Sequence, residues 1–276
     1  MRKKINLING NFITLDKHCP KAETISIENG KIAGVNAIDH NCENMDLNGA
    51  TVIPGFIDAH FHLTNLGKRL DMLQLKQCKS SLEVADLIIE KSQQINNNEW
   101  IFGFGWDHNK WDIPLYPQKN ILNQLPITNP IMLTRIDGHS CWVNNNAIKL
   151  ANFDLSYIPD GGNIINECIL IDNAMNPIQK ILPKSDEKMV EKWIKLALNI
   201  IVSRGITNIH DAWQDETTIK VINKLVDRGK FPIKCYGMLA SSNKLLLSHY
   251  FKNGPFKNKN YTIRSVKAFI DGALGS

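Results

Sequence analysis

Residues 5–53 alternate apolar and polar side chains over short stretches, which is the pattern of half-buried β-strands. The alternation is clearest over residues 23–35, ETISIENGKIAGV, where it continues on both sides of Asn29 and Gly30. An Asn-Gly pair favours a tight turn because both central positions tolerate a positive φ angle. The segment therefore predicts a leader of short antiparallel strands with a hairpin at this pair.

From residue 185 onward the pattern changes to helices that alternate with strands. Ser185 is a suitable N-cap, Asp186 and Glu187 suit the positive helix start, and Gly205 ends the predicted helix. The apolar residues that share one face of this helix are Met189, Trp193, Leu196, Ala197 and Ile200. Their spacing predicts that this face packs against a sheet.

Four apolar segments read as strands of one sheet, at about residues 53–60, 206–211, 232–238 and 264–270. A helix that ends at Gly229 lies between the second and third of them. Helix and strand units of this length imply parallel strands joined by crossover helices. The chain is therefore predicted to have an α/β fold.

A different region separates the first of these strands from the second. Ser80 and Glu83 have the spacing of a capping box and predict a helix over residues 80–95. Residues 99–112, EWIFGFGWDHNKWD, and 130–143, PIMLTRIDGHSCWV, then each join a short apolar strand to polar and aromatic residues. These segments are either the rim of a pocket or an ordinary aromatic edge of the core, and the composition does not decide between them.

The most informative segment is residues 51–63, TVIPGFIDAHFHL. Alternate side chains of an extended strand point the same way, so His60 and His62 share one face while Phe61 faces the other. The apolar residues before Asp58 predict a buried strand whose carboxyl end opens into a cavity. Two imidazoles placed in this way can bind one metal ion, and the alternative is two surface histidines that are close by chance.

Composition excludes several classes of function. The chain has 276 residues, 43% of them hydrophobic, and a net charge of +5 that is spread along the sequence without basic clusters. A nucleic-acid partner is therefore not expected, and no apolar run approaches the roughly 18 residues of a membrane span. The N-terminus does not read as a signal peptide, and the six cysteines have no paired spacing. We expect a cytoplasmic protein with reduced thiols.

Four motifs resemble one family. The string PGFIDAHFHL looks like the first barrel strand of the metal-dependent amidohydrolases. The elements Gly-x-Gly-Trp-Asp, Asp-Gly-His-x-x-Trp-Val-Asn and Val-Lys-x-x-x-Asp-Gly-x-Leu-Gly-Ser are similar to the branch that includes N-substituted formamide deformylase. The resemblance implies one or two divalent metal ions, with zinc expected, and an amide-like or formamide-like small molecule as substrate. It implies metal ligands at His60, His62 and Lys267. It implies substrate-pocket roles for Trp106, Asp107 and His139.

Lys267 becomes a candidate ligand only through this resemblance. A protonated amine is a poor ligand, but a buried lysine that takes up carbon dioxide becomes a carbamate, whose two anionic oxygens can bridge two metals. Without the resemblance, a strand lysine that extends its amine to solvent is the better interpretation. His210 and Asp211 end another predicted strand, and we expect them to support the ligands through hydrogen bonds rather than to bind metal.

The resemblance also implies a (β/α)₈ TIM barrel, of which the chain would hold about the first four strands. Residues 1–53 would form part of a small β-sandwich domain, and residues 54–276 the first half of the barrel with an insertion at about 98–184. The family's later histidines and its proton-shuttling aspartate would lie beyond the last residue, so no catalytic residue is predicted here. A separate C-terminal half or a homo-oligomer would be the partner.

Two functions follow from these expectations. The first is a metal-dependent hydrolase of non-peptide carbon–nitrogen bonds, present as part of a split or truncated enzyme with low activity on its own. The second is a non-catalytic relic or binding protein that keeps the half-barrel and its pocket residues.

Overall fold

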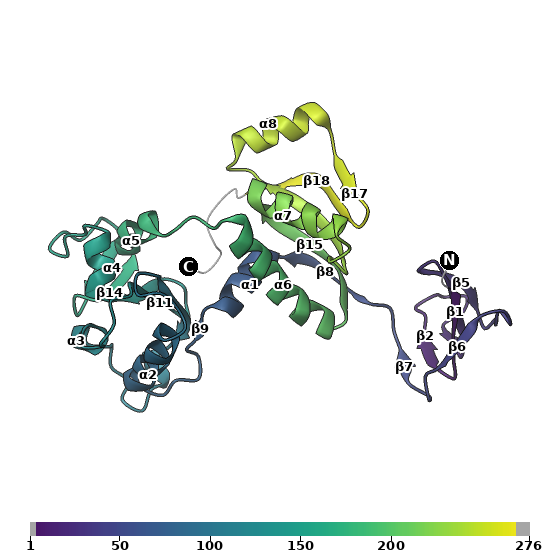
Figure 1. Cartoon of the computed structure of the whole chain (residues 1–276), viewed down its shortest axis with the longest axis horizontal. Helices are drawn as coiled ribbons and strands as arrows, with labels where there is room; N and C mark the ends of the chain where they lie inside the picture. Colours follow the sequence, from purple (N-terminus) through teal and green to yellow (C-terminus); the bar gives the residue numbers. More distant parts are fainter. Residues whose placement is uncertain (1–3, 269–276) are drawn as a thin grey trace.

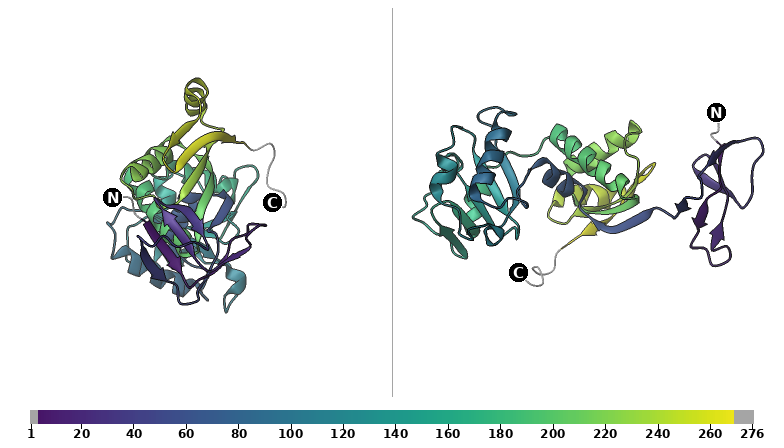
Figure 2. Two further views of the ribbon diagram at one scale, coloured as in Figure 1. Left: turned by 90° about the vertical axis from the view of Figure 1, so that its right-hand side faces the viewer. Right: turned by 90° about the horizontal axis from the view of Figure 1, so that it is seen from below.

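Three groups of elements follow one another in space in the computed structural model, which describes residues 4–268. The N-terminal strands lie at one end, and an extended segment joins them to a central sheet with its helices (Figure 1). Residues 73–181 form a further group on the other side of the central sheet, which we call the insertion body (Figure 2, right). The chain enters the insertion body from the central sheet and then returns to that sheet.

The N-terminal strands form two small sheets. The first has the order β5 (Lys31–Val35), β4 (Ile25–Glu28), β1 (Lys4–Ile8) and β6 (Glu43–Asp46). The second has the order β3 (Lys21–Ala22), β2 (Asn11–Ile13) and β7 (Thr51–Val52). The hairpin between β4 and β5 is confirmed, with φ angles of 53° at Asn29 and 74° at Gly30. The leader is not wholly antiparallel, because β6 and β7 pair in parallel with β1 and β2.

The central sheet has the order β17 (Phe256–Asn258), β18 (Tyr261–Lys267), β16 (Lys234–Ala240), β15 (Ile206–Gln214) and β8 (Phe56–Phe61). Every pairing from β18 to β8 is parallel, and β17 pairs antiparallel with β18. The helices of this part are α1 (Leu63–Asp71), α6 (Glu187–Ser203), α7 (Glu216–Asp227) and α8 (Lys244–Asn253). The predicted α/β arrangement of parallel strands and crossover helices is confirmed. Residues 269–276, where the last strand was predicted to continue, lie outside the described residues.

Helix α6 begins one residue later than predicted. Its N-cap is Asp186, whose Oδ1 accepts the backbone N–H of Met189 at 2.8 Å, so the expectation that Ser185 caps this helix is wrong. The buried face is also rotated, since Ile200 is 43% exposed. The buried residues of the helix are Val190, Trp193, Ile194, Ala197, Leu198 and Ile201. They pack against α7 and the central sheet in one apolar cluster.

A glycine allows α1 and α6 to approach closely. A Cβ atom on Gly67 would lie 1.9 Å from the backbone oxygen of Trp193, so only glycine fits at this crossing. The Trp193 indole N–H donates to Asp71 Oδ2 at 2.9 Å at the far end of α1. These contacts fix α1, and with it the end of β8, against the long helix.

Strand β8 is less buried than the sequence predicted. Phe56 is 56% exposed and Ile57 is 61% exposed. The strand is the last in the order of the central sheet, and β15 is its one hydrogen-bonded neighbour among residues 4–268. The prediction of a buried strand is therefore wrong for the part of the chain that the structure describes.

The insertion body is built on a mixed sheet. Its strand order is β13 (Gly162–Ile165), β14 (Ile169–Asp172), β12 (Ser140–Val143), β11 (Ile131–Arg135), β10 (Ile101–Trp106) and β9 (Leu73–Gln74). Its helices are α2 (Ser81–Ser92), α3 (Lys119–Asn123), α4 (Asn145–Leu150) and α5 (Asn176–Ile181), with the short 3-10 turns η1 (His108–Lys110) and η2 (Asn173–Met175). The predicted capping box is confirmed, because Ser80 Oγ accepts the N–H of Glu83 at 3.2 Å. The sheet and its cluster include β9 and α2, which precede residue 98.

Across the described range, residues 4–268, none of the helices combines the length and the apolar character needed to cross a membrane.

Candidate metal centre

The two histidines of the sequence motif lie together at the carboxyl end of β8. The ring centroids of His60 and His62 are 5.3 Å apart, with the ring planes at 60°. Asp58 Oδ1 accepts the backbone N–H of His60 at 3.0 Å, which fixes the local turn of the chain. The period-two spacing thus brings both imidazoles to one place, on a strand end that leads directly into α1.

One ring is oriented by the neighbouring strand. The Nδ1 atom of His62 lies 3.1 Å from the backbone oxygen of Ala212 on β15. A carbonyl oxygen only accepts, so Nδ1 is the donor in this contact, and in the neutral ring the lone pair is then on Nε2. Metal-binding histidines are commonly held in this way, with one ring nitrogen donating to a carbonyl and the other bound to the metal. The donor chemistry of the pair therefore fits a divalent metal.

Asp211 supports the same corner of the chain. Its carboxylate is 3% exposed, and Oδ1 accepts the N–H of Leu63, the residue after His62, at 2.7 Å. Oδ2 accepts the side-chain amide of Gln214 at 2.6 Å. Burial raises the pKa of the Asp211 carboxyl to about 6, and the two hydrogen bonds oppose that rise. These contacts place Asp211 beside the residue that follows His62, and its role in supporting a metal ligand stays a prediction.

His210 lies on β15, between the residues that pair with Asp58 and Phe61 of β8, whereas Lys267 lies on a more distant strand of the central sheet. The His210 ring is 5.2 Å from the ring of Tyr236 on β16, at a tilt of 46°. Lys267 ends β18, where its backbone pairs with Ala240. Two strands, β15 and β16, separate β18 from β8, which is three strand spacings of roughly 4.8 Å each. The distance between Lys267 and the histidine pair therefore depends on how strongly the sheet curves between β18 and β8.

The described residues supply part of a metal shell. No group of three or more His, Cys, Asp or Glu side chains that could hold a metal occurs among residues 4–268. Zinc in proteins takes four ligands, or three and a water. The histidine pair supplies ligands of the type that zinc prefers, but the described residues do not supply as many ligands as a zinc site needs.

A hollow of about 690 Å³ opens beside the pair. His60 and His62 line one side, and Phe104, Thr134 and Gly138 of the insertion body line another. The Arg69 guanidinium lies over the Phe104 ring, 4.5 Å from its centroid. The hollow therefore lies between the histidine pair and the insertion body.

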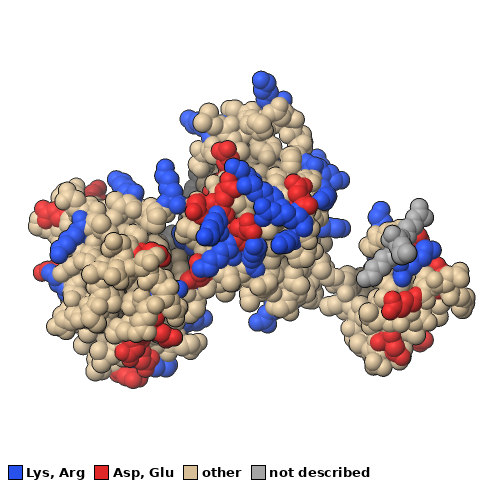
Figure 3. Space-filling model, in the orientation of Figure 1, with Lys and Arg blue, Asp and Glu red and all other residues tan. Residues whose placement is uncertain are grey.

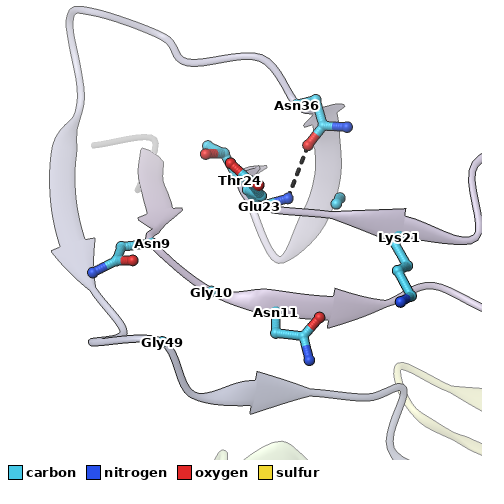
Figure 4. Close-up of a pocket in the computed structure, with 9 residues that line it drawn as sticks. Asn9, Gly10, Asn11, Lys21, Glu23, Thr24, Asn36 and Gly49 are labelled. Carbon is cyan, nitrogen blue, oxygen red and sulfur yellow. Dashed lines mark hydrogen bonds between the residues drawn. The ribbon is translucent and has the colours of Figure 1, made fainter.

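A second hollow of about 690 Å³ lies among the N-terminal strands and has a different character. Amide side chains and backbone of residues such as Asn9, Asn11 and Asn36 line it, and Asn36 Oδ1 accepts the N–H of Glu23 at 2.9 Å (Figure 4). It has no histidine, cysteine or aspartate in its lining. Glu23 is the one carboxylate among the residues that line this hollow, so it lacks the imidazole pair of the hollow at β8.

The residues predicted to line a substrate pocket differ in their burial and in their contacts. Trp106 has no exposed surface and donates its indole N–H to the backbone oxygen of Leu133 at 2.8 Å. Its ring lies among other buried tryptophans, which agrees with an aromatic core edge, one of the two interpretations that the sequence left open. Asp107 caps η1 and pairs with Arg135 at 3.4 Å. Substrate contact by Trp106 or Asp107 stays a prediction.

His139 lies just before β12, at the same end of the insertion sheet as Trp106 and Arg135. Its Nδ1 atom is 2.9 Å from Asp172 Oδ1, and both side chains are about half exposed. Gly138, the preceding residue, lines the hollow beside the histidine pair. A substrate contact from His139 likewise stays a prediction.

Charges on the helical side of the central sheet are mixed in sign. Figure 3 shows lysine and arginine side chains interspersed with aspartate and glutamate on this face. Glu187 pairs with Lys220 and Lys224 at 2.5 Å each, and these contacts lower the pKa of the Glu187 carboxyl to about 2. The lysine and arginine side chains gather over the central part of this face, with carboxylates among them.

Sequence reasoning missed three partners of the site. They are the Ala212 carbonyl, Gln214 and Tyr261, and the last of these donates its hydroxyl to Gln214 Oε1 at 2.5 Å. No spacing in the sequence could have linked them to His62, because about 150 residues separate the two segments. The one signal in the sequence was the run of polar residues that begins at Gln214, shortly after the strand predicted at residues 206–211.

A parallel α/β sheet with a His-x-His pair at the carboxyl end of its first strand is an arrangement typical of metal-dependent hydrolases. The chain belongs to the amidohydrolase family, whose sequence model matches residues 43–276. The family resemblance inferred from the motifs is confirmed.

Individual relatives agree with this assignment. The chain is 27% identical to YtcJ of Bacillus subtilis (strain 168), over 97% of this chain and 54% of YtcJ. It is 23% identical to the N-substituted formamide deformylase of Arthrobacter pascens, over 99% of this chain and 55% of the enzyme. The crystal structure of an uncharacterized metal-dependent hydrolase from Pyrococcus furiosus superimposes with a TM-score of 0.79 at 25% identity, over 99% of this chain and 57% of that one. The chain thus spans about half the length of the relatives it matches.

Proposed function

We propose that the protein is a metal-dependent hydrolase of carbon–nitrogen bonds other than peptide bonds, with amide-like or formamide-like substrates. The observation that carries the proposal is the pair His60 and His62, in which the Ala212 carbonyl leaves His62 Nε2 available to a metal. One or two divalent ions, zinc in the first place, would be held there. A small molecule would enter the hollow beside the pair.

The reaction follows from this placement. A bound divalent metal supplies a water whose pKa is lowered to about 7 and polarises the scissile carbonyl. His60 and His62 would hold that metal, and Asp211 and Ala212 keep the His62 ring in one orientation. Lys267, as a carbamate formed from its amine and carbon dioxide with loss of a proton, would contribute two further oxygens.

The remaining ligands would come from the part of the relatives that this chain does not span. We propose that β8, β15, β16 and β18 are the first four strands of a (β/α)₈ barrel, that residues 1–53 are part of a β-sandwich and that residues 54–276 are the first half of the barrel. Residues 98–184 would be its insertion. The later histidines and the proton-shuttling aspartate would then lie in a second half, on the same polypeptide or on another chain.

Hydrolysis by the assembled protein tests the proposal. The chain is produced together with the segment that corresponds to the second half of its relatives, and aryl and alkyl formamides are assayed with Zn²⁺ and after chelation. We expect formamide hydrolysis that needs both segments, is lost on chelation and is lost in His62→Asn. Activity that survives chelation, or no hydrolysis of any amide by a folded, metal-loaded assembly, would contradict it.

The second candidate is a binding protein without turnover. It is favoured by the small number of metal donors among the described residues. Tight binding of formamides by the assembled protein without product formation would support this alternative.

We propose a cytoplasmic location. All six cysteines, which lie within the described residues, are unpaired, and four of them are buried. Unpaired buried thiols suit a reducing compartment. Separation of a cell lysate into cytoplasmic, periplasmic and membrane fractions would test this location, and we expect a tagged chain in the cytoplasmic fraction.

A further inference from the structure

Strand β15 departs from regular pairing just beside the histidine pair. Its register with β16 shifts between Asp211 and Gln214, and Trp213 in the shift has a φ angle of 70°. A bulky residue in this region of backbone conformation is strained and persists only where surrounding contacts enforce it. The bulge presents the Ala212 carbonyl to His62 while both Asp211 and Gln214 remain buried.

A buried chain of hydrogen bonds runs through the bulge. Tyr261 on β18 donates to Gln214 Oε1 at 2.5 Å, Gln214 Nε2 donates to Asp211 Oδ2 at 2.6 Å, and Leu63 N–H donates to Asp211 Oδ1 at 2.7 Å. Each of these four residues is at most 3% exposed. An ionised carboxylate only accepts, so the amide must direct its nitrogen to Asp211 and its oxygen to the tyrosine. The orientation of every member is therefore determined.

The sheet leaves space for this chain. A Cβ atom on Gly237 of β16 would lie 2.1 Å from Gln214 Oε1, so a side chain at this position would displace the amide. Strands β15, β16 and β18 each contribute to the network, and it ends at the residue that follows His62. Buried polar networks in which every group is satisfied make the surrounding geometry rigid.

We propose that Gln214 and Tyr261 are positioning residues for the His62 ligand. They hold the Asp211 carboxylate, Asp211 holds the Leu63 backbone, and the bulge that the network stabilises holds His62 Nδ1 on the Ala212 carbonyl. Nε2 is then directed to the metal in a single tautomer and orientation. The inference rests on the proposed function, because it assigns these residues to the same metal site.

The test uses two variants of the full chain and a matched control. Tyr261→Phe removes one hydroxyl, Gln214→Met removes both amide groups at similar volume, and Tyr250→Phe removes a hydroxyl from a half-buried tyrosine of the same apolar cluster. Co²⁺ affinity is measured by titration, and the His62 tautomer is measured in the metal-free chain by ¹⁵N chemical shifts of the imidazole. Circular dichroism checks folding.

We expect Co²⁺ affinity to fall about 10- to 100-fold in Gln214→Met and less in Tyr261→Phe, since groups that orient ligands have effects of this size. The His62 resonances should change from a pure Nδ1–H form to a mixture, and Tyr250→Phe should match the wild type. Folded variants with wild-type affinity and an unchanged tautomer would overturn the inference. If the wild type does not bind Co²⁺ even when assembled with the second half of its relatives, but the tautomer still responds, the metal proposal fails and the positioning role stands. If Gln214→Met does not fold, Tyr261→Phe alone decides.

Discussion

At the residue scale, Asn144 shows how one side chain of the insertion motif acts through structure. It is 3% exposed, and its Oδ1 accepts the backbone N–H groups of both Ile131 and Ala147 at 3.0 Å. Its Nδ2 donates to the backbone oxygen of Asn129 at 2.9 Å. The side chain thus caps α4 and ties that helix to the start of β11, so its place in the motif has a structural reason.

Substitution of Asn144 measures this contribution. We expect Asn144→Ala to lower the free energy of unfolding by about 2 to 3 kcal/mol, because a helix cap is lost and a buried carbonyl and N–H lose their partner. Urea unfolding followed by tryptophan fluorescence is the measurement. Asn98→Ala, at an exposed turn, is the control and should change stability by less than about 0.5 kcal/mol. Equal stability of the two variants would contradict the assigned role.

The sequence predicted the relative placement of residues that are close together in the chain, because that placement depends only on the local backbone. The facing of His60 and His62 follows from the two-residue period of a strand, and the structure places their rings together. The partners of His62 could not be predicted, because they reach it through a bulge in a strand about 150 residues away. Burial of Trp106 was also open, since an aromatic residue after a strand suits a core or a pocket equally.

At the element scale, helix α6 shows the limit of boundary prediction. Its existence and length follow from apolar periodicity, yet two adjacent residues, Ser185 and Asp186, are both good caps. The structure selects Asp186, and the buried face then includes Val190 and Ile194 rather than Ile200. Tertiary packing against α7 and α1, which a single helix pattern does not contain, decides between such neighbouring alternatives.

The choice of cap is testable with a pair of variants. Asp186→Ala should cost about 1 kcal/mol of stability, because the N–H of Met189 loses its acceptor and the helix start loses a favourable charge. Ser185→Ala should be within about 0.3 kcal/mol of the wild type. Thermal unfolding followed by circular dichroism compares the two. A larger effect from Ser185 than from Asp186 would mean that the helix begins one residue earlier.

At the scale of the whole molecule, the first strand of the central sheet is at an edge. Phe56 and Ile57 are more than half exposed. Val266, on β18 at the other side of the set of parallel strands, is 39% exposed. The sequence predicted burial here because the apolar pattern is that of a strand covered on both faces. The α/β class and the parallel strands could be predicted, whereas the edge position of β8 depends on the order of the strands, which the apolar pattern does not contain.

An exposed apolar edge predicts self-association of this chain in isolation. We expect Ile57→Lys to shift the protein toward the monomer at high concentration, because a charge opposes strand-to-strand pairing at the edge. Leu245→Lys, at a residue of α8 that is 86% exposed, makes the same charge change elsewhere and should leave association unchanged. Sedimentation velocity over a concentration series is the measurement. A wild type that is monomeric throughout, or equal effects of the two variants, would contradict the assignment of the edge.

The central claim is that His60 and His62 form the metal-binding part of an amidohydrolase site. The most direct measurement is calorimetric titration with Zn²⁺ of the metal-free chain assembled with the segment that corresponds to the second half of its relatives, for the wild type, His60→Asn, His62→Asn and a His249→Asn control on the exposed face of α8. We predict that the wild type and His249→Asn bind Zn²⁺ with the same affinity and that each substitution in the pair abolishes this binding. Undiminished Zn²⁺ binding in His60→Asn and His62→Asn, or no binding by the folded wild type, would contradict the account.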